Sequence, residues 1–141
     1  ERLRPIVRRC CEIKAAIVSQ DEFETKDLRA LLNFGHTLGH AIEAVSGFKT
    51  YLHGEAVAMG MVYAANLSVK KGYLKTDDAK YLTSLISKAG LPTIMPKNTT
   101  NKRLKQAINS DKKRVSQFIN FVYLSGLGKA FAKKTPLTEV I

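Results

Sequence analysis

The sequence predicts a mainly α-helical fold with one small β-hairpin near its C-terminal end. Up to about residue 109, apolar residues recur with helical periodicity in segments punctuated by glycine and proline. The period changes in QFINFVYL at 117–124, a run rich in aromatic and β-branched residues. A chain of 141 residues without repeats or linkers fits a single domain spanning 1–141.

The first part of the chain predicts two helices. Residues 2–19 form the first, with Pro5 in its first turn, where proline is tolerated. After the polar segment 19–27, a second helix is expected over 29–46, closed by Gly47.

Two further helices follow a short connection at 48–51. The third is expected over 52–69, and its sequence HGEAVAMGMVYAA is small or apolar on nearly every side, which predicts burial. The fourth is expected over 77–89, with Thr76 as its N-cap and Gly90 at its end.

The last part of the chain predicts a short helix and then the hairpin. The expected elements are a loop at 96–100, a helix at 101–109, strands at 117–124 and 129–134, a turn at 125–128, and a last helical turn opened by Thr135 and Pro136.

The chain carries a formal net charge of +11 and a pI of about 9.8, which favours an anionic partner such as nucleic acid, a membrane surface or a phosphorylated substrate. Its basic residues fall into separate clusters and do not alternate with aromatic residues as in single-strand binders. Most of them therefore indicate a solvated surface. A non-enzymatic, basic helical module that binds nucleic acid remains an alternative, and it predicts affinity that falls steeply with salt.

Two features argue against a membrane or secreted protein. The apolar run at 56–65 is too short to span a bilayer, and the start of the sequence does not read as a secretory signal. Cys10 and Cys11 are adjacent, and neighbouring cysteines rarely bridge. We expect them to be reduced thiols of a cytoplasmic protein, more typical of small core residues than of catalysis.

All three histidines of the chain, His36, His40 and His53, lie in one short window. Histidine both binds zinc and exchanges protons near neutral pH. On a continuous helix over 29–46, spacings of 4, 3, 4 and 3 place five polar residues on one face: Arg29, Asn33, His36, His40 and Glu43.

The same helix has an apolar face and two glycines one turn apart. The residues expected in the core are Leu31, Phe34, Leu38, Ile42 and Val45. Gly35 and Gly39 each cost roughly 1 kcal/mol relative to alanine inside a helix. Two such costs predict the close approach of another backbone or of a ligand.

Spacing alone leaves two interpretations of the histidines open. His36 and His40 at i and i+4 could share a metal ion with His53, which starts the next helix, where the helix dipole favours anions. Alternatively, they are helix histidines that make local hydrogen bonds, since the motif lacks the glutamate of HExxH. The polar stripe and the nearby third histidine favour a site.

Two adjacent motifs resemble one enzyme family. RALLNFGHTLGHAIEA followed by LHGEAVAMGM closely resembles 3-dehydroquinate synthase, and CEIKAAIVSQDE and DKKRVSQFINFVYLSGLGKA extend the resemblance over essentially the whole chain. The resemblance implies the helical C-terminal domain of that enzyme. It also implies a separate N-terminal domain that binds NAD and supplies the glutamate of a zinc site made by one glutamate and two histidines.

The resemblance also implies roles for individual residues. His36 and His53 would be ligands of Zn²⁺ or another divalent cation such as Co²⁺, and His53 would also contact substrate. His40 would transfer protons. Contacts to the substrate's carboxylate and phosphate are implied for Lys14, Arg29, Asn33 and one of Lys112 and Lys113, with Lys113 favoured. Glu24 would be a proton acceptor, and it lies near an apparent one-residue insertion in ETKD.

The implied reaction converts 3-deoxy-D-arabino-heptulosonate 7-phosphate to 3-dehydroquinate and phosphate in the shikimate pathway. Because the chain lacks the NAD site and one metal ligand, we expect it to be inactive alone and to bind zinc weakly. The family implies a homodimer. The alternatives are another sugar-phosphate cyclase, such as 2-deoxy-scyllo-inosose synthase, and a degenerate domain with a regulatory or structural role.

Overall fold

The computed structural model describes residues 3–23, 25–97, 99–111 and 117–141, and within them the predicted fold class is confirmed. The elements are, in order, α1 (Arg4–Gln20), the 3₁₀ helix η1 (Arg29–Asn33), α2 (His36–Val45), α3 (His53–Lys70), α4 (Thr76–Lys88), α5 (Asn101–Asp111), β1 (Phe118–Gly126), β2 (Lys129–Pro136) and α6 (Leu137–Val140). The fourth helix begins at Thr76, so the residue in the N-cap position is Lys75, not the predicted Thr76.

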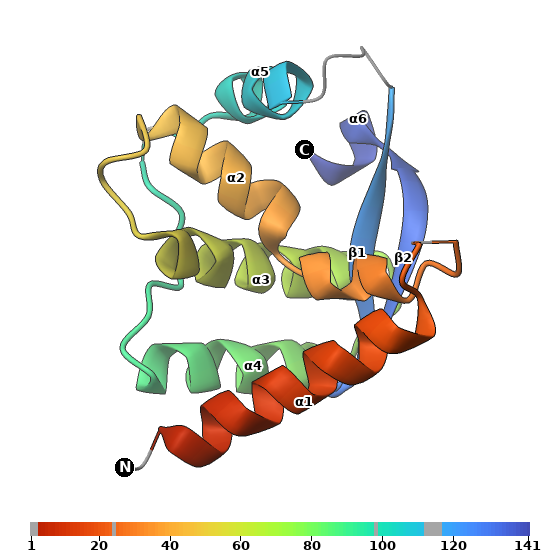
Figure 1. Ribbon diagram of the computed structural model, residues 1–141. Helices are drawn as coiled ribbons and strands as arrows, with labels where there is room; N and C mark the ends of the chain where they lie inside the picture. The colour runs from red at the N-terminus through yellow and green to blue at the C-terminus, as the bar shows by residue number, and fades with distance from the viewer. Residues whose placement is uncertain (1–2, 24, 98, 112–116) are drawn as a thin grey trace.

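The central element is α3, which packs between α2 and α4 and also contacts β1 (Figure 1). On the far side of α2 lies α5. Small residues such as Ala56, Ala64 and Ala65 are fully buried along α3, so neighbouring backbones can come close to it. The predicted burial of this helix is confirmed.

A buried serine joins α3 to the hairpin. The Ser68 hydroxyl donates to the Ala64 carbonyl oxygen at 2.7 Å and accepts from the Leu124 amide of β1 at 3.0 Å. Both bonding roles of this buried polar group are therefore satisfied, which avoids the cost of an unpaired group. The bond fixes β1 against α3.

The hairpin pairs antiparallel, with Phe118 opposite Pro136 at its open end. Its register shifts between Leu124 and Gly126, close to the turn. The ring of Tyr123 is almost fully buried and stacks on Phe131 of β2, with 5.7 Å between ring centroids. This contact joins the two strands, and Tyr73, which follows α3, meets the same two rings edge-on at 5.3 and 5.2 Å, so the predicted hairpin packs on the helical part of the chain.

The prediction of one continuous helix over 29–46 is wrong. Phe34 has ψ near 122° and Gly35 has φ near +80°, so the chain turns between η1 and α2. A Cβ at Gly35 would lie 2.6 Å from a side-chain atom of Met61 and 2.8 Å from the Val57 carbonyl oxygen, both on α3. Glycine is required here because both the backbone conformation and the contact exclude a side chain.

The predicted close approach at the glycines is confirmed. A Cβ added at Gly39 would lie 3.1 Å from the Cα of Val57, and one at Gly60 would lie 2.1 Å from the carbonyl oxygen of Gly35. Of the five residues predicted for the core of the 29–46 segment, Leu38 and Ile42 are fully buried, Phe34 and Val45 are partly buried against the core, and Leu31 is partly buried. The two helices therefore meet backbone to backbone.

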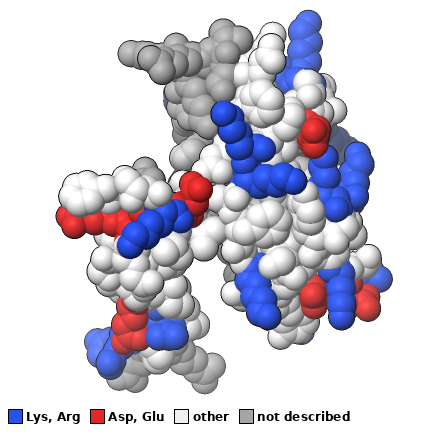
Figure 2. Space-filling model, turned by 90° about the vertical axis from the view of Figure 1, so that its right-hand side faces the viewer, with Lys and Arg blue, Asp and Glu red and all other residues white. Residues whose placement is uncertain are grey.

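In contrast, α1 is loosely attached. It contains no buried residue, and 60% of Ile6 is exposed. Together with the segment after it, α1 forms a lobe that stands apart from the body of the molecule, with a gap between them (Figure 2). Cys10 and Cys11 are free, as expected, but both are exposed, so the expected core role is wrong.

No helix in the described part of the chain is long and apolar enough to cross a membrane.

Candidate functional site

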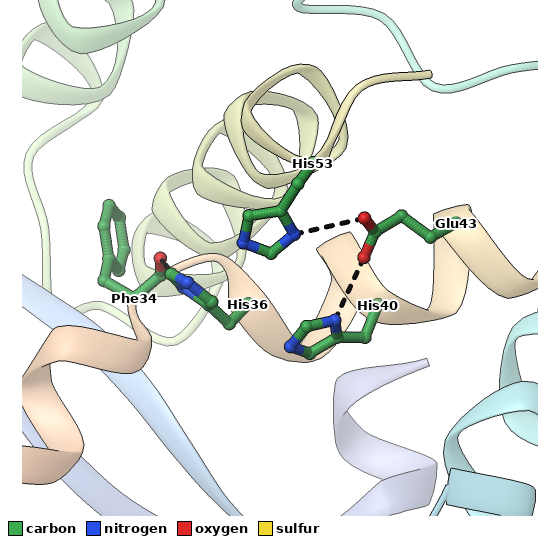
Figure 3. Close-up of polar contacts among 5 residues, drawn as sticks. All are labelled: Phe34, His36, His40, Glu43 and His53. Carbon is green, nitrogen blue, oxygen red and sulfur yellow. Dashed lines mark hydrogen bonds and ion pairs between the residues drawn. The ribbon is translucent and has the colours of Figure 1, made fainter. Parts of the chain in front are cut away.

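The three histidines converge where α2 meets the start of α3. His36 and His40 lie one turn apart on α2, and His53 is the first residue of α3. The ring centroids of His36 and His53 are 5.3 Å apart, those of His40 and His53 are 5.4 Å apart, and those of His36 and His40 are 5.8 Å apart. The three rings face a common space (Figure 3).

One carboxylate bridges two of these rings. Glu43 Oε2 accepts from His40 Nδ1 at 3.0 Å, and Glu43 Oε1 accepts from His53 Nδ1 at 3.1 Å. Only 13% of the glutamate side chain is exposed, whereas about half of each histidine side chain is exposed (51% for His40 and 53% for His53). The carboxylate is thus the better shielded member of the cluster.

These hydrogen bonds determine which nitrogen of each histidine ring is available to bind a metal or a proton. His36 Nδ1 lies 3.3 Å from the Phe34 carbonyl oxygen, so in all three histidines Nδ1 faces an oxygen. Carbonyl and carboxylate oxygens only accept hydrogen bonds, so the neutral imidazoles carry their proton on Nδ1. The Nε2 atoms keep a lone pair for a metal or a proton. In Figure 3 the second nitrogens of His40 and His53 point away from Glu43.

The donor set fits a divalent metal such as zinc. Zinc binds imidazole nitrogens at about 2.0–2.1 Å, and catalytic sites use three protein ligands and one open position. The short separation of the rings of His36 and His53 suits two ligands of one ion. A second grouping is formed by His40, Glu43 and His53, whose ligand atoms lie within 4.8 Å of one another.

Local electrostatics differ between the histidine and the glutamate on α2. Burial lowers the pKa of His36, and the nearby imidazoles of His53 and His40 lower it further, so this ring favours the neutral form that binds metals. Burial acts to raise the pKa of Glu43, but the hydrogen bonds from His40 and His53 outweigh it and leave the pKa lowered. The cluster therefore combines an ionised carboxylate with a neutral imidazole.

A pocket of about 850 Å³ opens beside the cluster, between α2, α5 and β1. Asn33 of η1 and His36 and His40 of α2 line part of it. Arg103 and Gln106 of α5 and Asn120 of β1 line it as well. Its size and mixed lining suit a small polar ligand.

Two predicted substrate contacts lie elsewhere. Lys14 is exposed on α1, and the guanidinium of Arg29 donates to the Glu22 carbonyl oxygen at 3.0 Å. Neither residue is part of the described lining of the pocket. Because the chain turns at Gly35, Arg29 and Asn33 lie on η1 and not on the helix of His36. The prediction of five polar residues on one helix face is therefore wrong, and only His36, His40 and Glu43 share α2. Glu24, Lys112 and Lys113 lie outside the described residues.

Sequence reasoning missed the anchor of the segment that carries Arg29. The side chain of the buried Asp21 accepts from the backbone amides of Thr25, Lys26 and Arg29 at 2.8, 3.0 and 3.1 Å. An aspartate directly after a helix and before a polar loop was the available signal. The α5 residues Arg103 and Gln106 gave no such signal, because only tertiary packing brings α5 beside α2.

Comparison with known proteins identifies the family of the chain. The family profile described as 3-dehydroquinate synthase C-terminal matches residues 1–114. The chain belongs to the 3-dehydroquinate synthase family. A 3-dehydroquinate synthase of Thermoanaerobacter pseudethanolicus is 50% identical over 141 residues, which is 100% of this chain. A second, from Pelobacter propionicus, is 48% identical over 126 residues, or 89% of this chain.

This member of the 3-dehydroquinate synthase family is shorter than those relatives. The matched region covers 39% of the Thermoanaerobacter protein and 34% of the Pelobacter protein. The chain thus spans less than half of their length, in the part that the family profile describes as C-terminal.

Solved structures of sugar-phosphate cyclases share the fold. One is a 2-deoxy-scyllo-inosose synthase complexed with carbaglucose-6-phosphate, NAD⁺ and Co²⁺, at a TM-score of 0.83 and 26% identity, covering 99% of this chain and 40% of that one. Another is the 2-epi-5-epi-valiolone synthase ValA from Streptomyces hygroscopicus subsp. jinggangensis with NAD⁺ and Zn²⁺ bound. It aligns at a TM-score of 0.78 over 96% of this chain and 37% of that one. Its 20% identity establishes likeness of fold alone.

Proposed function

We propose that this chain is the metal- and substrate-binding part of a 3-dehydroquinate synthase. The reaction is the phosphate-eliminating cyclisation of 3-deoxy-D-arabino-heptulosonate 7-phosphate to 3-dehydroquinate, a lyase step of aromatic amino-acid biosynthesis in the cytoplasm. The observation that carries the proposal is 50% identity, along the entire chain, to an enzyme of that name. The convergence of His36, His40 and His53 supports it.

In this proposal His36 and His53 are two ligands of a Zn²⁺ or Co²⁺ ion, through their Nε2 atoms. The third ligand and the NAD site would come from an N-terminal domain, consistent with the chain covering only 39% of the Thermoanaerobacter relative. A bound metal would supply polarisation of a substrate hydroxyl, and NAD would supply a hydride acceptor. The 2-deoxy-scyllo-inosose synthase structure with NAD⁺ and Co²⁺, at 26% identity, supports this assignment.

The other residues bind and orient the substrate. The imidazole of His40 lines the pocket, and its free Nε2 atom transfers protons. Asn33 also lines the pocket, and its amide would donate a hydrogen bond to the substrate. Arg29 suits a planar carboxylate and Lys14 suits a phosphate, so these two contacts require the substrate to reach toward η1 and α1. Lys113 and Glu24 complete the proposed set, as a substrate contact and a proton acceptor.

The test is an assembled enzyme. The chain is combined with the N-terminal portion of the Thermoanaerobacter relative, and phosphate release is measured with NAD and Zn²⁺, with metal removal as a control. We expect metal- and NAD-dependent activity from the pair, none from the chain alone, and loss to background in His53→Ala. Lys49→Ala, an exposed change in the turn between α2 and α3, is the matched control and should stay active. Full activity in His53→Ala would refute the proposal.

The likeness to 2-deoxy-scyllo-inosose synthase motivates one alternative substrate. That reaction uses a sugar phosphate without a carboxylate, so Arg29 would have no carboxylate to bind. We expect the assembled enzyme to release phosphate from 3-deoxy-D-arabino-heptulosonate 7-phosphate and not from glucose 6-phosphate. The opposite preference would assign the alternative.

A further inference from the structure

Glu43 is the only described residue whose side chain joins histidines from both α2 and α3. We propose that Glu43 is a positioning residue that holds His40 and His53 with their protons on Nδ1, so that both Nε2 atoms are available for chemistry. The part of this proposal that concerns the metal rests on the proposed function, whereas the part that concerns proton position does not.

The two hydrogen bonds use separate oxygens of one carboxylate. Oε2 serves His40 at 3.0 Å and Oε1 serves His53 at 3.1 Å. A carboxylate can accept at both oxygens, whereas an amide offers one acceptor and one donor. Only an ionised Glu43 therefore satisfies two Nδ1 donors at the same time. The same bonds link the end of α2 to the start of α3 across ten residues of sequence.

The backbone around Glu43 supports this task. Its carbonyl oxygen accepts from the Phe48 amide at 2.8 Å, which closes the C-terminal end of α2, and its side chain is mostly buried. His40 and His53 are half exposed, so packing alone does not fix their rings. The mostly buried Glu43 therefore orients the exposed rings of His40 and His53, as carboxylates hydrogen-bonded to histidine ligands do in metal sites.

A competing arrangement makes Glu43 itself a ligand, together with His40 and His53. In that case metal binding would break both Nδ1 hydrogen bonds and use Nδ1 atoms as ligands. With a metal bound, the two arrangements predict opposite tautomers for His40 and His53, so imidazole ¹⁵N shifts of the Zn²⁺-loaded chain separate them, whereas the metal-free shifts test only the position of the protons.

The test compares wild type with Glu43→Gln and Glu43→Ala in the 141-residue chain. Imidazole ¹⁵N shifts are recorded without metal at pH 8.5, well above the ordinary imidazole pKa of about 6.5. We expect Nδ1–H tautomers for His40 and His53 in wild type. In Glu43→Gln one of the two should change to Nε2–H, because the amide NH₂ group faces one Nδ1 atom. Glu12→Gln, an exposed loss of the same charge on α1, should change neither.

Titration with Co²⁺ alone gives the second measurement. Loss of an orienting partner should weaken Co²⁺ binding by roughly 10–100-fold in Glu43→Gln, with unchanged circular dichroism. Nε2–H tautomers in wild type, or unchanged tautomers in both Glu43 variants, would overturn the proposal. A tautomer change in Glu43→Gln with no change in Co²⁺ affinity would support the proton positions and refute the part of the proposal that concerns the metal.

Discussion

The pair α2 and α3 differs from α1 in how firmly each fixes its functional side chains. Between α2 and α3 the backbones touch at glycines, and the histidines on them sit within 5.3–5.8 Å of one another, ring to ring. No residue of α1 is buried, and its Lys14 is exposed. The comparison teaches that the histidine cluster is preorganised within this chain, whereas the anion contacts proposed on α1 depend on how α1 is packed in the assembled enzyme.

The largest expected effect is on the contact between α2 and α3. In Gly60→Ala the new methyl group would meet the Gly35 carbonyl oxygen at 2.1 Å, and backbone cannot move away cheaply. Overpacking costs typically about 1–3 kcal/mol, and we expect this substitution to exceed that range. The measurement is urea unfolding followed by circular dichroism.

The matched control is Gly54→Ala, at the start of the same helix, where an added Cβ meets nothing within 4 Å. It should be neutral or stabilise by up to about 1 kcal/mol, because alanine reduces the freedom of the unfolded chain. Equal stability losses in both variants would contradict the close-packed contact.

The second prediction compares cavities in the two regions directly. Leu38 of α2 is fully buried, so Leu38→Ala should lower the free energy of unfolding by roughly 2–5 kcal/mol. Ile6 of α1 is 60% exposed, so Ile6→Ala should change it by less than about 0.5 kcal/mol. Both are measured by urea unfolding, and a large loss in Ile6→Ala would show that α1 packs more firmly than described.

The third prediction concerns the connection between α1 and α2. Asp21→Asn weakens the hydrogen bonds to the amides of Thr25, Lys26 and Arg29, so thermal unfolding at pH 7 should occur at a lower temperature. Glu22→Gln, an exposed loss of the same charge next to it, should have a smaller effect.

At acid pH the difference in thermal stability between wild type and Asp21→Asn should disappear. Burial acts to raise the pKa of Asp21, but the backbone hydrogen bonds outweigh it and leave the pKa lowered. A folded pKa below the unfolded one means that the stabilisation is present above the unfolded pKa, near 3.8, and is lost as pH falls through the folded value. The gap between wild type and Asp21→Asn should therefore begin to narrow near pH 4 and close as pH falls through the lowered pKa of Asp21. A gap that stays constant down to pH 2 would contradict this role.

The sequence predicted most of the helices, the hairpin and the proximity of the histidines. Periodicity sufficed for α3, because a helix that is small and apolar on all sides must be buried. It failed at Gly35, where helical spacing continues through a position whose backbone is left-handed. Local pattern does not contain that turn, because its cause is the contact with Met61 and Val57 of another helix.

By itself, the sequence determined the helical fold class, the chemistry available in its histidines, and the close approach of another backbone or a ligand at Gly35 and Gly39. Only the tertiary structure decided that Glu43 bridges His40 and His53, that α5 closes the pocket, and that Arg29 leaves the helix face of His36. The physical reason is the distance along the chain over which each property is set. Periodicity and glycine cost are local properties of the chain, whereas the position of a side chain depends on contacts between segments far apart in sequence.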